Sequence, residues 1–339
     1  MGVGLDIGSK TIKIIELLKE GNSIKLNGSG VVGYKGVSPE NFKEEKDLLD
    51  LAQIIKKLHK EARISSKDIS IAMPESKVFT RVIRFPLLTD QEISSAIKWE
   101  AEQYIPIPIN EAIIQHQIIS RNEKGANSGV KVLLIAVSRN LVEVYIRLIQ
   151  NAGLNVVKAE TELLALNRAF APIDKVTLII DFGATSTDIA ICDHGILSFS
   201  RSIPTAGEAF TRAIAQNLNI TIQQAEEYKK AYGLSDLQLE GKIKGALDPI
   251  FKLVSDEIKK AIYYYQSEEK GDSPSTVILT GGTSGLPDAV TYLSKLLGLE
   301  IVVGNPFSKV SLSPETSKVI APYAPLYSIS VGLAMGDLS

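Results

Sequence analysis

Alternation of hydrophobic and polar positions divides the first 80 residues into strand-like and helix-like stretches. Residues 4–7, 11–18 and 24–34 are predicted as three successive strands joined by tight turns. Apolar residues then recur every three or four positions over residues 45–61, which predicts a helix, and residues 69–72 form a short buried strand. This order of elements predicts a mixed α/β fold.

Residues 78–157 are predicted to form a unit of their own, with the order β-α-β-β-α. Its first helix begins at a capping box made by Thr89 and Glu92, which satisfy each other's backbone groups at the helix start. The helix must end before Pro106 and Pro108, because proline cannot continue a helix. Strands near 112–120 and 130–137 and a helix over 140–152 complete the unit.

The second half repeats the opening pattern of strands and then becomes mostly helical. A strand at 156–160 leads into a helix, and strand-like runs follow on either side of a Gly turn at residue 183. Helices are predicted from about residue 209 and over 249–268, 288–297 and 323–336, with strands at 276–280 and 300–303. The last helix is expected to pack on the first half and to link the two halves a second time.

A strand that ends in Asp, followed by any residue and then Gly, occurs twice. The first copy contains Asp6 and Gly8, and the second contains Asp181 and Gly183. Glycine lets the backbone approach a ligand closely, and turn amides with nearby hydroxyls suit phosphate. The predicted phosphate ligands are Gly8, Ser9, Lys10, Thr11, Lys13, Gly183, Ala184, Thr185, Ser186 and Thr187, with Asp6 and Asp181 as Mg²⁺ ligands. For either copy alone, a plain hairpin turn containing Gly is the alternative.

A third motif follows the buried strand at 276–280. The strand ends in Gly281 and Gly282, followed by Thr283, and a helix begins nearby. Such a turn lets a flat ring or a phosphate lie against bare backbone. The three motifs in this order resemble the actin, Hsp70 and sugar-kinase superfamily of nucleotide-binding proteins. That resemblance implies two similar halves that close on ATP and Mg²⁺.

Composition narrows the functional classes. The chain has 339 residues, of which 45% are hydrophobic, enough for two cores, and its net charge of −2 argues against a nucleic-acid binder. Cys192 is the single cysteine, so an intramolecular disulfide is impossible and a reducing cytosol fits best. Since no apolar run reaches the roughly 18 residues of a membrane span, we expect a cytoplasmic protein; the family resemblance described next implies that it meets the inner membrane only through protein partners.

Four segments resemble the PilM family of type IV pilus assembly proteins: residues 96–108, 134–139, 152–154 and 160–166. Ile107 stands where an aromatic residue is common in the family. The resemblance implies an actin-like (ribonuclease-H-like) two-lobed ATPase fold with an inserted subdomain, 1C, in place of subdomain 1B of actin. The implied boundaries are 1–77, 158–177 and 318–339 for subdomain 1A, 78–157 for 1C, 178–220 and 272–317 for 2A, and 221–271 for 2B.

The resemblance also implies roles for five further residues. Glu162, with Glu160 as second choice, stands where the superfamily orients the attacking water; a carboxylate favoured at a helix start is the alternative. Gly207 matches a position near the purine. Glu226 and Lys229 match a pattern that contacts ribose or adenine, although a surface ion pair between neighbouring helix positions also explains them.

Three functions are consistent with these features. The first, implied by the family, is an ATP-binding scaffold with at most slow ATPase activity. It would bind the N-terminal cytoplasmic peptide of PilN in a groove between 1A and 1C, and the pilus motor ATPases are further candidate partners. The second is a sugar-kinase-like phosphotransferase, for which we find no convincing general base. The third is a division protein like FtsA, which usually ends in an amphipathic membrane helix that we do not find here.

Overall fold

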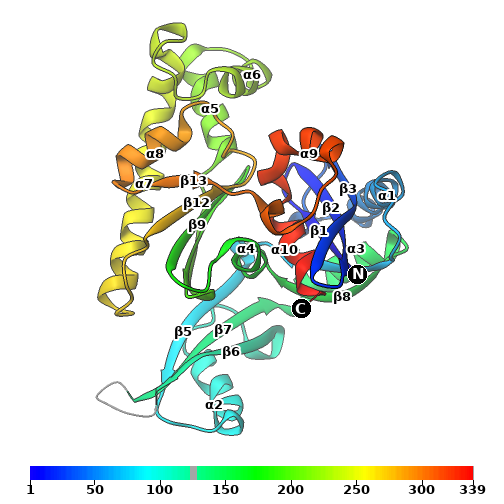
Figure 1. Ribbon diagram of the computed structural model, residues 1–339, viewed down its shortest axis with the longest axis vertical. Coiled ribbons are helices and arrows are strands. Elements are labelled where there is room, and N and C mark those ends of the chain that lie inside the picture. Colours follow the sequence, from blue (N-terminus) through cyan, green and yellow to red (C-terminus); the bar gives the residue numbers. More distant parts are fainter. Residues whose placement is uncertain (123–127, 339) are drawn as a thin grey trace.

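The computed structural model describes residues 1–122 and 128–338, which form two lobes and an inserted unit (Figure 1). Each lobe contains a five-stranded mixed sheet. The first has the order β3-β2-β1-β4-β8 and the second the order β11-β10-β9-β12-β13. In each sheet the first three strands in chain order pair antiparallel, and the last two strands join in parallel. The two halves therefore share one topology.

The first sheet comprises β1 (Gly2–Ile7), β2 (Thr11–Glu20), β3 (Ser23–Gly33), β4 (Asp68–Met73) and β8 (Asn155–Thr161). Helices α1 (Glu45–Glu61) and α3 (Arg139–Asn151) cover one of its faces and share a core with it. The sequence places α3 in the inserted unit. In the structure, Tyr145, Leu148 and Ile149 of α3 are buried among residues of β1, β4 and α1, so by packing this helix goes with the first sheet.

The second sheet comprises β9 (Val176–Phe182), β10 (Thr187–Asp193), β11 (Ile196–Ile203), β12 (Thr276–Thr280) and β13 (Ile301–Val303). It packs with α5 (Gly207–Leu218), α6 (Ile222–Tyr232), α7 (Lys242–Ser267) and α8 (Ala289–Leu297). Helix α7 begins earlier than predicted, and Pro249 lies inside it. Burial of Ile243 and Leu247 offsets the backbone hydrogen bond that proline removes.

Two helices lie between the sheets and join the lobes: α4 (Glu162–Phe170) and α10 (Ser328–Gly336) (Figure 1). Leu163 and Leu166 of α4 and Leu333 of α10 share a core with Ile179 and Cys192 of the second sheet. The predicted return of the last helix to the first half is confirmed, since α10 also packs on the first sheet. The regions before it are α9 (Pro314–Ile320) and a 3₁₀ segment, Ala321–Tyr327.

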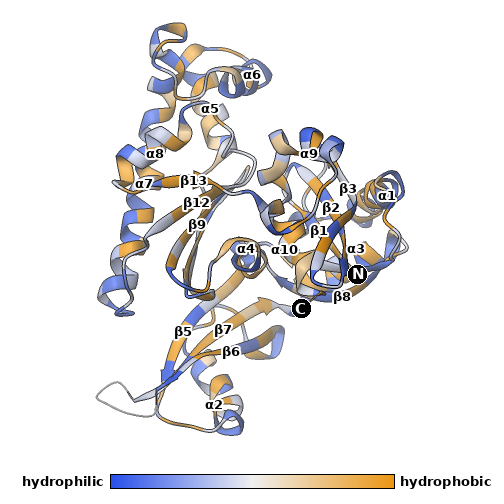
Figure 2. Ribbon diagram, in the orientation of Figure 1, coloured by the Kyte–Doolittle hydropathy of each residue, from blue (hydrophilic) through white to orange (hydrophobic). Residues whose placement is uncertain are grey.

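One stretch meets the length and composition of a membrane span, contrary to the sequence expectation. It is Pro314–Gly336, and 61% of its apolar window is buried inside the protein. A core helix of a globular protein passes the same test. In Figure 2 hydrophobic residues likewise gather on the central strands, whereas α1 and α7 alternate between hydrophobic and hydrophilic positions.

The inserted unit is a three-stranded antiparallel sheet with one helix beside it. Its strands β5 (Val78–Phe85), β6 (Ala112–Asn122) and β7 (Gly129–Ser138) have the order β5-β7-β6. Helix α2 (Asp90–Glu102) starts at the predicted capping box of Thr89 and Glu92. Ile93, Ile97 and Ala101 bury the apolar face of α2 in the core of this unit.

Candidate nucleotide-binding site

The two predicted phosphate loops are hairpin turns with the same closure. In the first, the amide of Gly8 donates to the carbonyl of Thr11 at 3.1 Å, and in the second the amide of Gly183 donates to the carbonyl of Ser186 at 3.0 Å. The loops meet across the lobes, because the hydroxyls of Ser9 and Thr185 lie 2.9 Å apart. The fold therefore brings two distant segments together as the sequence repeat predicts.

A second contact joins the first loop to the opposite lobe. The ammonium group of Lys10 lies 2.6 Å from a carboxylate oxygen of Glu208, which belongs to the first turn of α5. Both side chains are partly exposed, so this ion pair contributes little to stability. The Lys10 side chain is thus exposed beside both loops, where an anion bound there could replace Glu208 as its partner.

The two strand-end aspartates differ in what faces them. Asp6 pairs in register with Lys13, whose ammonium group lies 2.8 Å from the Asp6 carboxylate, and both side chains are buried. Asp181 pairs in register with another carboxylate, Asp188. One oxygen of Asp188 accepts a bond from Ser186 at 2.7 Å, and the other has no hydrogen-bond partner within the described residues.

This arrangement raises the pKa values of both aspartates of the second lobe. Burial and the neighbouring Asp188 and Asp6 carboxylates raise the pKa of Asp181 to about 7, against the lowering effect of Lys13. Burial raises the pKa of Asp188 to about 6, while the nearby hydroxyls of Ser202 and Ser186 oppose the shift. Near neutral pH Asp181 is therefore partly protonated, and a divalent cation would displace that proton.

Two more carboxyl groups complete the acidic cluster, which we define as Asp6, Glu75, Glu162, Asp181 and Asp188. A carboxylate oxygen of Glu162 accepts the backbone amide of Glu75 at 2.8 Å. Burial, followed by the Asp188 and Asp6 charges, raises the pKa of Glu162 well above its usual range. Burial and Asp188 raise the pKa of Glu75 to about 8, and one of its oxygens has no hydrogen-bond partner in the described chain.

Sequence reasoning missed Asp188 and Glu75. A signal for Asp188 existed, because it follows Asp181 at the same spacing at which Lys13 follows Asp6. No signal in the sequence pointed to Glu75, because it lies in a 3₁₀ turn after β4, outside any motif.

The cluster suits a divalent cation that also binds other oxygens. Carboxylate oxygens are hard ligands, and two of those in the cluster are buried without a partner among the described residues. Among the residues that the structure describes, no three His, Cys, Asp or Glu side chains are close enough to hold a metal by themselves. A cation here would therefore need further oxygens, from water or from a ligand such as phosphate.

The predicted adenosine loop packs against the second phosphate loop. The Thr283 hydroxyl donates to the carbonyl of Gly183 at 2.9 Å, and its amide donates to Phe182 at 3.0 Å. Gly281 has φ +86°, and a Cβ at this position would lie 2.2 Å from a carboxylate oxygen of Asp181. Only glycine avoids both the backbone strain and that clash, while Gly282 lies near Leu326.

Lys229 supports the backbone beside these loops. It is buried and donates to the carbonyl of Gly207 at 2.9 Å and to the hydroxyl of Thr211 at 2.8 Å, and it lies 2.6 Å from Glu226. The ion pair with Glu226 exists, but burial distinguishes it from the surface pair considered above. All three ammonium hydrogens have partners, so Lys229 positions Gly207, whose amide donates to Gly183 at 3.3 Å.

Two predicted site residues have other partners. Glu160 forms a two-pronged ion pair with Arg168, at 2.6 and 2.7 Å, and Arg168 also donates to the carbonyl of Gly332 in α10. This contact fixes α4 against α10 and leaves Glu162 as the candidate at the cleft. Thr187 is fully buried and its hydroxyl donates to the carbonyl of Thr205 at 2.7 Å, so it supports the loop from behind.

Comparison with known proteins gives a family and several structural relatives. The family model described as type IV pilus assembly protein PilM matches residues 4–338. A solved structure of a PilM-PilN type IV pilus biogenesis complex contains a chain that is 27% identical, with a TM-score of 0.86, covering 100% of this chain and 98% of that one.

Two more distant relatives also match nearly the whole chain. The cell division protein FtsA of Pseudomonas aeruginosa is 24% identical over 386 residues, covering 100% of this chain and 89% of the relative. MreB5 of Spiroplasma citri, solved with AMPPNP, is 14% identical with a TM-score of 0.56, covering 99% and 95% of the two chains. The fold is therefore actin-like, and the chain belongs to the PilM family of type IV pilus assembly proteins.

Proposed function

We propose that this protein is an ATP-binding, actin-like scaffold on the cytoplasmic side of the type IV pilus inner-membrane platform, where it binds the N-terminal cytoplasmic peptide of PilN. The observation that carries the proposal is the full-length likeness to a chain of a PilM-PilN complex. The peptide would lie between subdomain 1A and the inserted unit.

The cleft supports the nucleotide part of this proposal. The backbone amides of the two loops, with Ser9, Thr11, Ala184 and Thr185, would hold the phosphates from both lobes. Gly207 and the loop 281–283 would face the nucleoside. Asp181 and Asp6 would hold Mg²⁺ directly or through water, assisted by Asp188.

Hydrolysis, if it occurs, would depend on Glu162. Its carboxyl lies in the acidic cluster, and burial raises its pKa well above the usual range, which favours the protonated form that cannot accept a proton from water. Bound Mg²⁺ would favour the ionised form. We therefore expect slow ATPase activity at most, and only in the presence of the cation.

The nucleotide assignment is tested by Asp181→Ala. Loss of this carboxylate should weaken ATP–Mg²⁺ binding at least tenfold in a calorimetric titration, because it removes a cation ligand. Asp174→Ala changes an exposed acid shortly before β9 and is the matched control. Full ATP affinity in Asp181→Ala would show that the site is assigned wrongly.

The partner assignment is tested with a synthetic N-terminal peptide of PilN from the same organism. Calorimetric titration without and with ATP–Mg²⁺ should show saturable binding. A difference between the two titrations would show that the peptide and nucleotide sites are coupled. Lack of binding in both states would reject PilN capture while leaving the fold and family unchanged.

A division role like that of FtsA is a second candidate, because FtsA matches the whole chain at 24% identity. Membrane attachment of the isolated protein would favour it. Co-sedimentation with vesicles of bacterial lipids distinguishes the two, since the pilus scaffold should stay in the supernatant unless a membrane-bound partner is added.

A further inference from the structure

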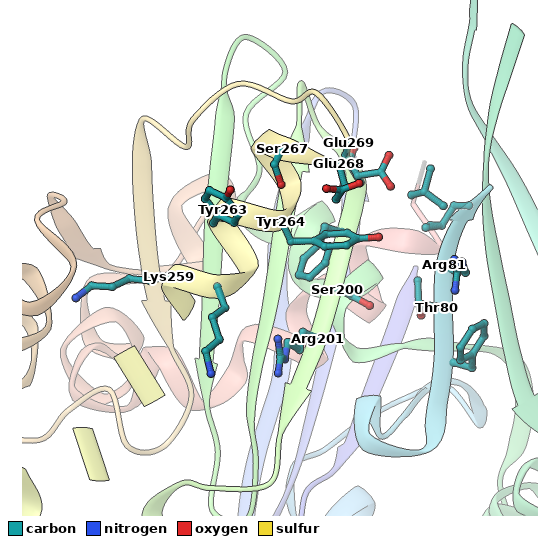
Figure 3. A pocket seen from close by; sticks show the side chains of 16 residues that line it. Thr80, Arg81, Ser200, Arg201, Lys259, Tyr263, Tyr264, Ser267, Glu268 and Glu269 are labelled. Carbon is teal, nitrogen blue, oxygen red and sulfur yellow. The ribbon is translucent and has the colours of Figure 1, made fainter. Parts of the chain in front are cut away.

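A cavity of about 740 Å³ lies away from the nucleotide site, between the inserted unit and the second lobe (Figure 3). One wall is β5 of the inserted unit, and the other walls are β11 and the C-terminal half of α7. A volume of this size holds several amino-acid side chains or a drug-sized molecule.

Both β strands that line the cavity are edge strands. β5 is the first strand in the order β5-β7-β6, and β11 is the first in the order β11-β10-β9-β12-β13. They belong to separate sheets, so each has a row of amides and carbonyls without a ladder partner. This geometry suits an extended chain that adds to a sheet edge.

The side chains of the cavity combine an aromatic surface with a basic rim. Phe199 and Tyr264 pack with ring centroids 5.7 Å apart, beside Phe79 and Leu133. Tyr263 is 73% exposed at the rim. Burying such rings against an apolar side chain is a strong source of binding energy.

The charges at the rim favour an acidic occupant. The cavity is lined by the cations Arg81, Arg201, Lys259 and Lys260 and by two acids, Glu268 and Glu269. Arg201 and Lys260 both pair with Glu257, and Glu269 pairs with Arg84 at 3.1 Å.

Two of these cations remain available. For Arg81 and Lys259, the described residues offer no acidic partner within ion-pair distance. The guanidinium of Arg81 lies 3.9 Å from the ring centroid of Tyr104, a contact that orients it and leaves its N–H groups able to bind a carboxylate.

We propose that this cavity is a second peptide site, which binds an extended partner segment with an aromatic or large aliphatic residue flanked by Asp or Glu. The segment adds to the edge of β5 or β11, its apolar side chain packs against Phe199 and Tyr264, and its carboxylates meet Arg81 and Lys259. It is separate from the proposed PilN groove, because none of its lining residues comes from subdomain 1A as the sequence bounds it.

Occupancy of the cavity is also coupled to the nucleotide cleft, a part of the proposal that rests on the proposed nucleotide binding. Its walls belong to the inserted unit and to the second lobe, so the affinity for an occupant depends on how these two parts are oriented. β11, which carries Ser200 of the cavity wall, packs against the 3₁₀ turn that contains Glu75 of the acidic cluster. Nucleotide and peptide must then change each other's affinity by the same factor.

The test begins with a phage-displayed library of random octapeptides. It is selected on the full-length protein and depleted on the double variant Arg81→Glu, Lys259→Glu. Both side chains are exposed, so the variant should fold normally. We expect a consensus with acids around one aromatic or branched apolar residue. A synthetic peptide of that consensus should bind the parent protein and lose at least tenfold affinity in the double variant and in Tyr264→Ala.

Two controls separate this site from others. Lys56→Glu reverses one charge on an exposed position of α1 and should leave binding unchanged. The same variants should keep their affinity for ATP–Mg²⁺ and for the PilN peptide. If neither ATP–Mg²⁺ nor the PilN peptide binds the parent protein, the proposed function is rejected. The affinity for the consensus peptide, measured without nucleotide, is independent of that result.

Different results would overturn the peptide site, its coupling to nucleotide, or the kind of occupant. No enriched consensus, or a consensus peptide that binds the double variant as well as the parent, rejects the peptide site. Equal peptide affinity with and without ATP–Mg²⁺, in a protein shown to bind ATP, rejects the coupling. A mononucleotide that competes with the peptide in the parent but not in Tyr264→Ala assigns the cavity to a small molecule instead.

Discussion

Glu75→Gln should stabilise the nucleotide-free protein, by an amount that depends on pH. The Glu75 carboxyl has a pKa of about 8 in the folded protein against an ordinary value of 4.5, because it is buried beside Asp188. Between these values the folded state holds a proton that the unfolded state releases. The free energy of unfolding therefore falls as pH rises, by about 1.4 kcal/mol per pH unit for one group.

The size of the effect follows from that slope. At pH 7 the group is about 2.5 units above its ordinary pKa, which corresponds to a gain of about 3 kcal/mol at most for the glutamine variant. At pH 4.5 and below both states of the parent are protonated, so the gain should nearly vanish. Glutamine keeps the size of the side chain and removes its charge.

Urea unfolding of parent and variant at pH 5, 6, 7 and 8, without nucleotide or divalent cation, measures this difference. It should widen steadily from pH 5 to pH 7 and level off near pH 8. Glu40→Gln, which neutralises a partly buried acid outside the cluster, is the control and should show no such widening. A constant difference across this range, or a variant less stable than the parent at pH 7, would refute the reasoning.

Three further predictions concern single contacts. Gly281→Ala should unfold at lower urea concentration and lose ATP binding, because its Cβ would meet the carboxylate of Asp181 at 2.2 Å at a positive φ; unchanged calorimetric affinity would contradict this. Arg168→Met should cost about 3 kcal/mol in urea unfolding by leaving Glu160 buried with only Lys158 nearby, yet spare ATP affinity. Lys229→Met should weaken ATP binding severalfold by releasing the Gly207 carbonyl, with the effect on titrations larger than that on melting temperature.

Local patterns in the sequence predict most elements of this fold. Helix α1 begins and ends where its apolar spacing predicts, and the capping box of α2 forms as read. The two loops also follow from their residues, because Asp and Gly at a strand end constrain the turn within a few positions. Pro249 misled the prediction of α7, since burial of the first turns outweighs the local cost of proline.

The sequence by itself thus determined the duplicated strand-turn-strand units, the family and the loops that face each other. Only the tertiary structure decided which side chains remain available in the cleft. It buried Asp188 opposite Asp181, brought Glu75 beside Glu162, and paired Glu160 with Arg168. These relations depend on sheet register and on the packing of α4 between the lobes. They join residues far apart in the chain, which periodicity and turn chemistry cannot connect.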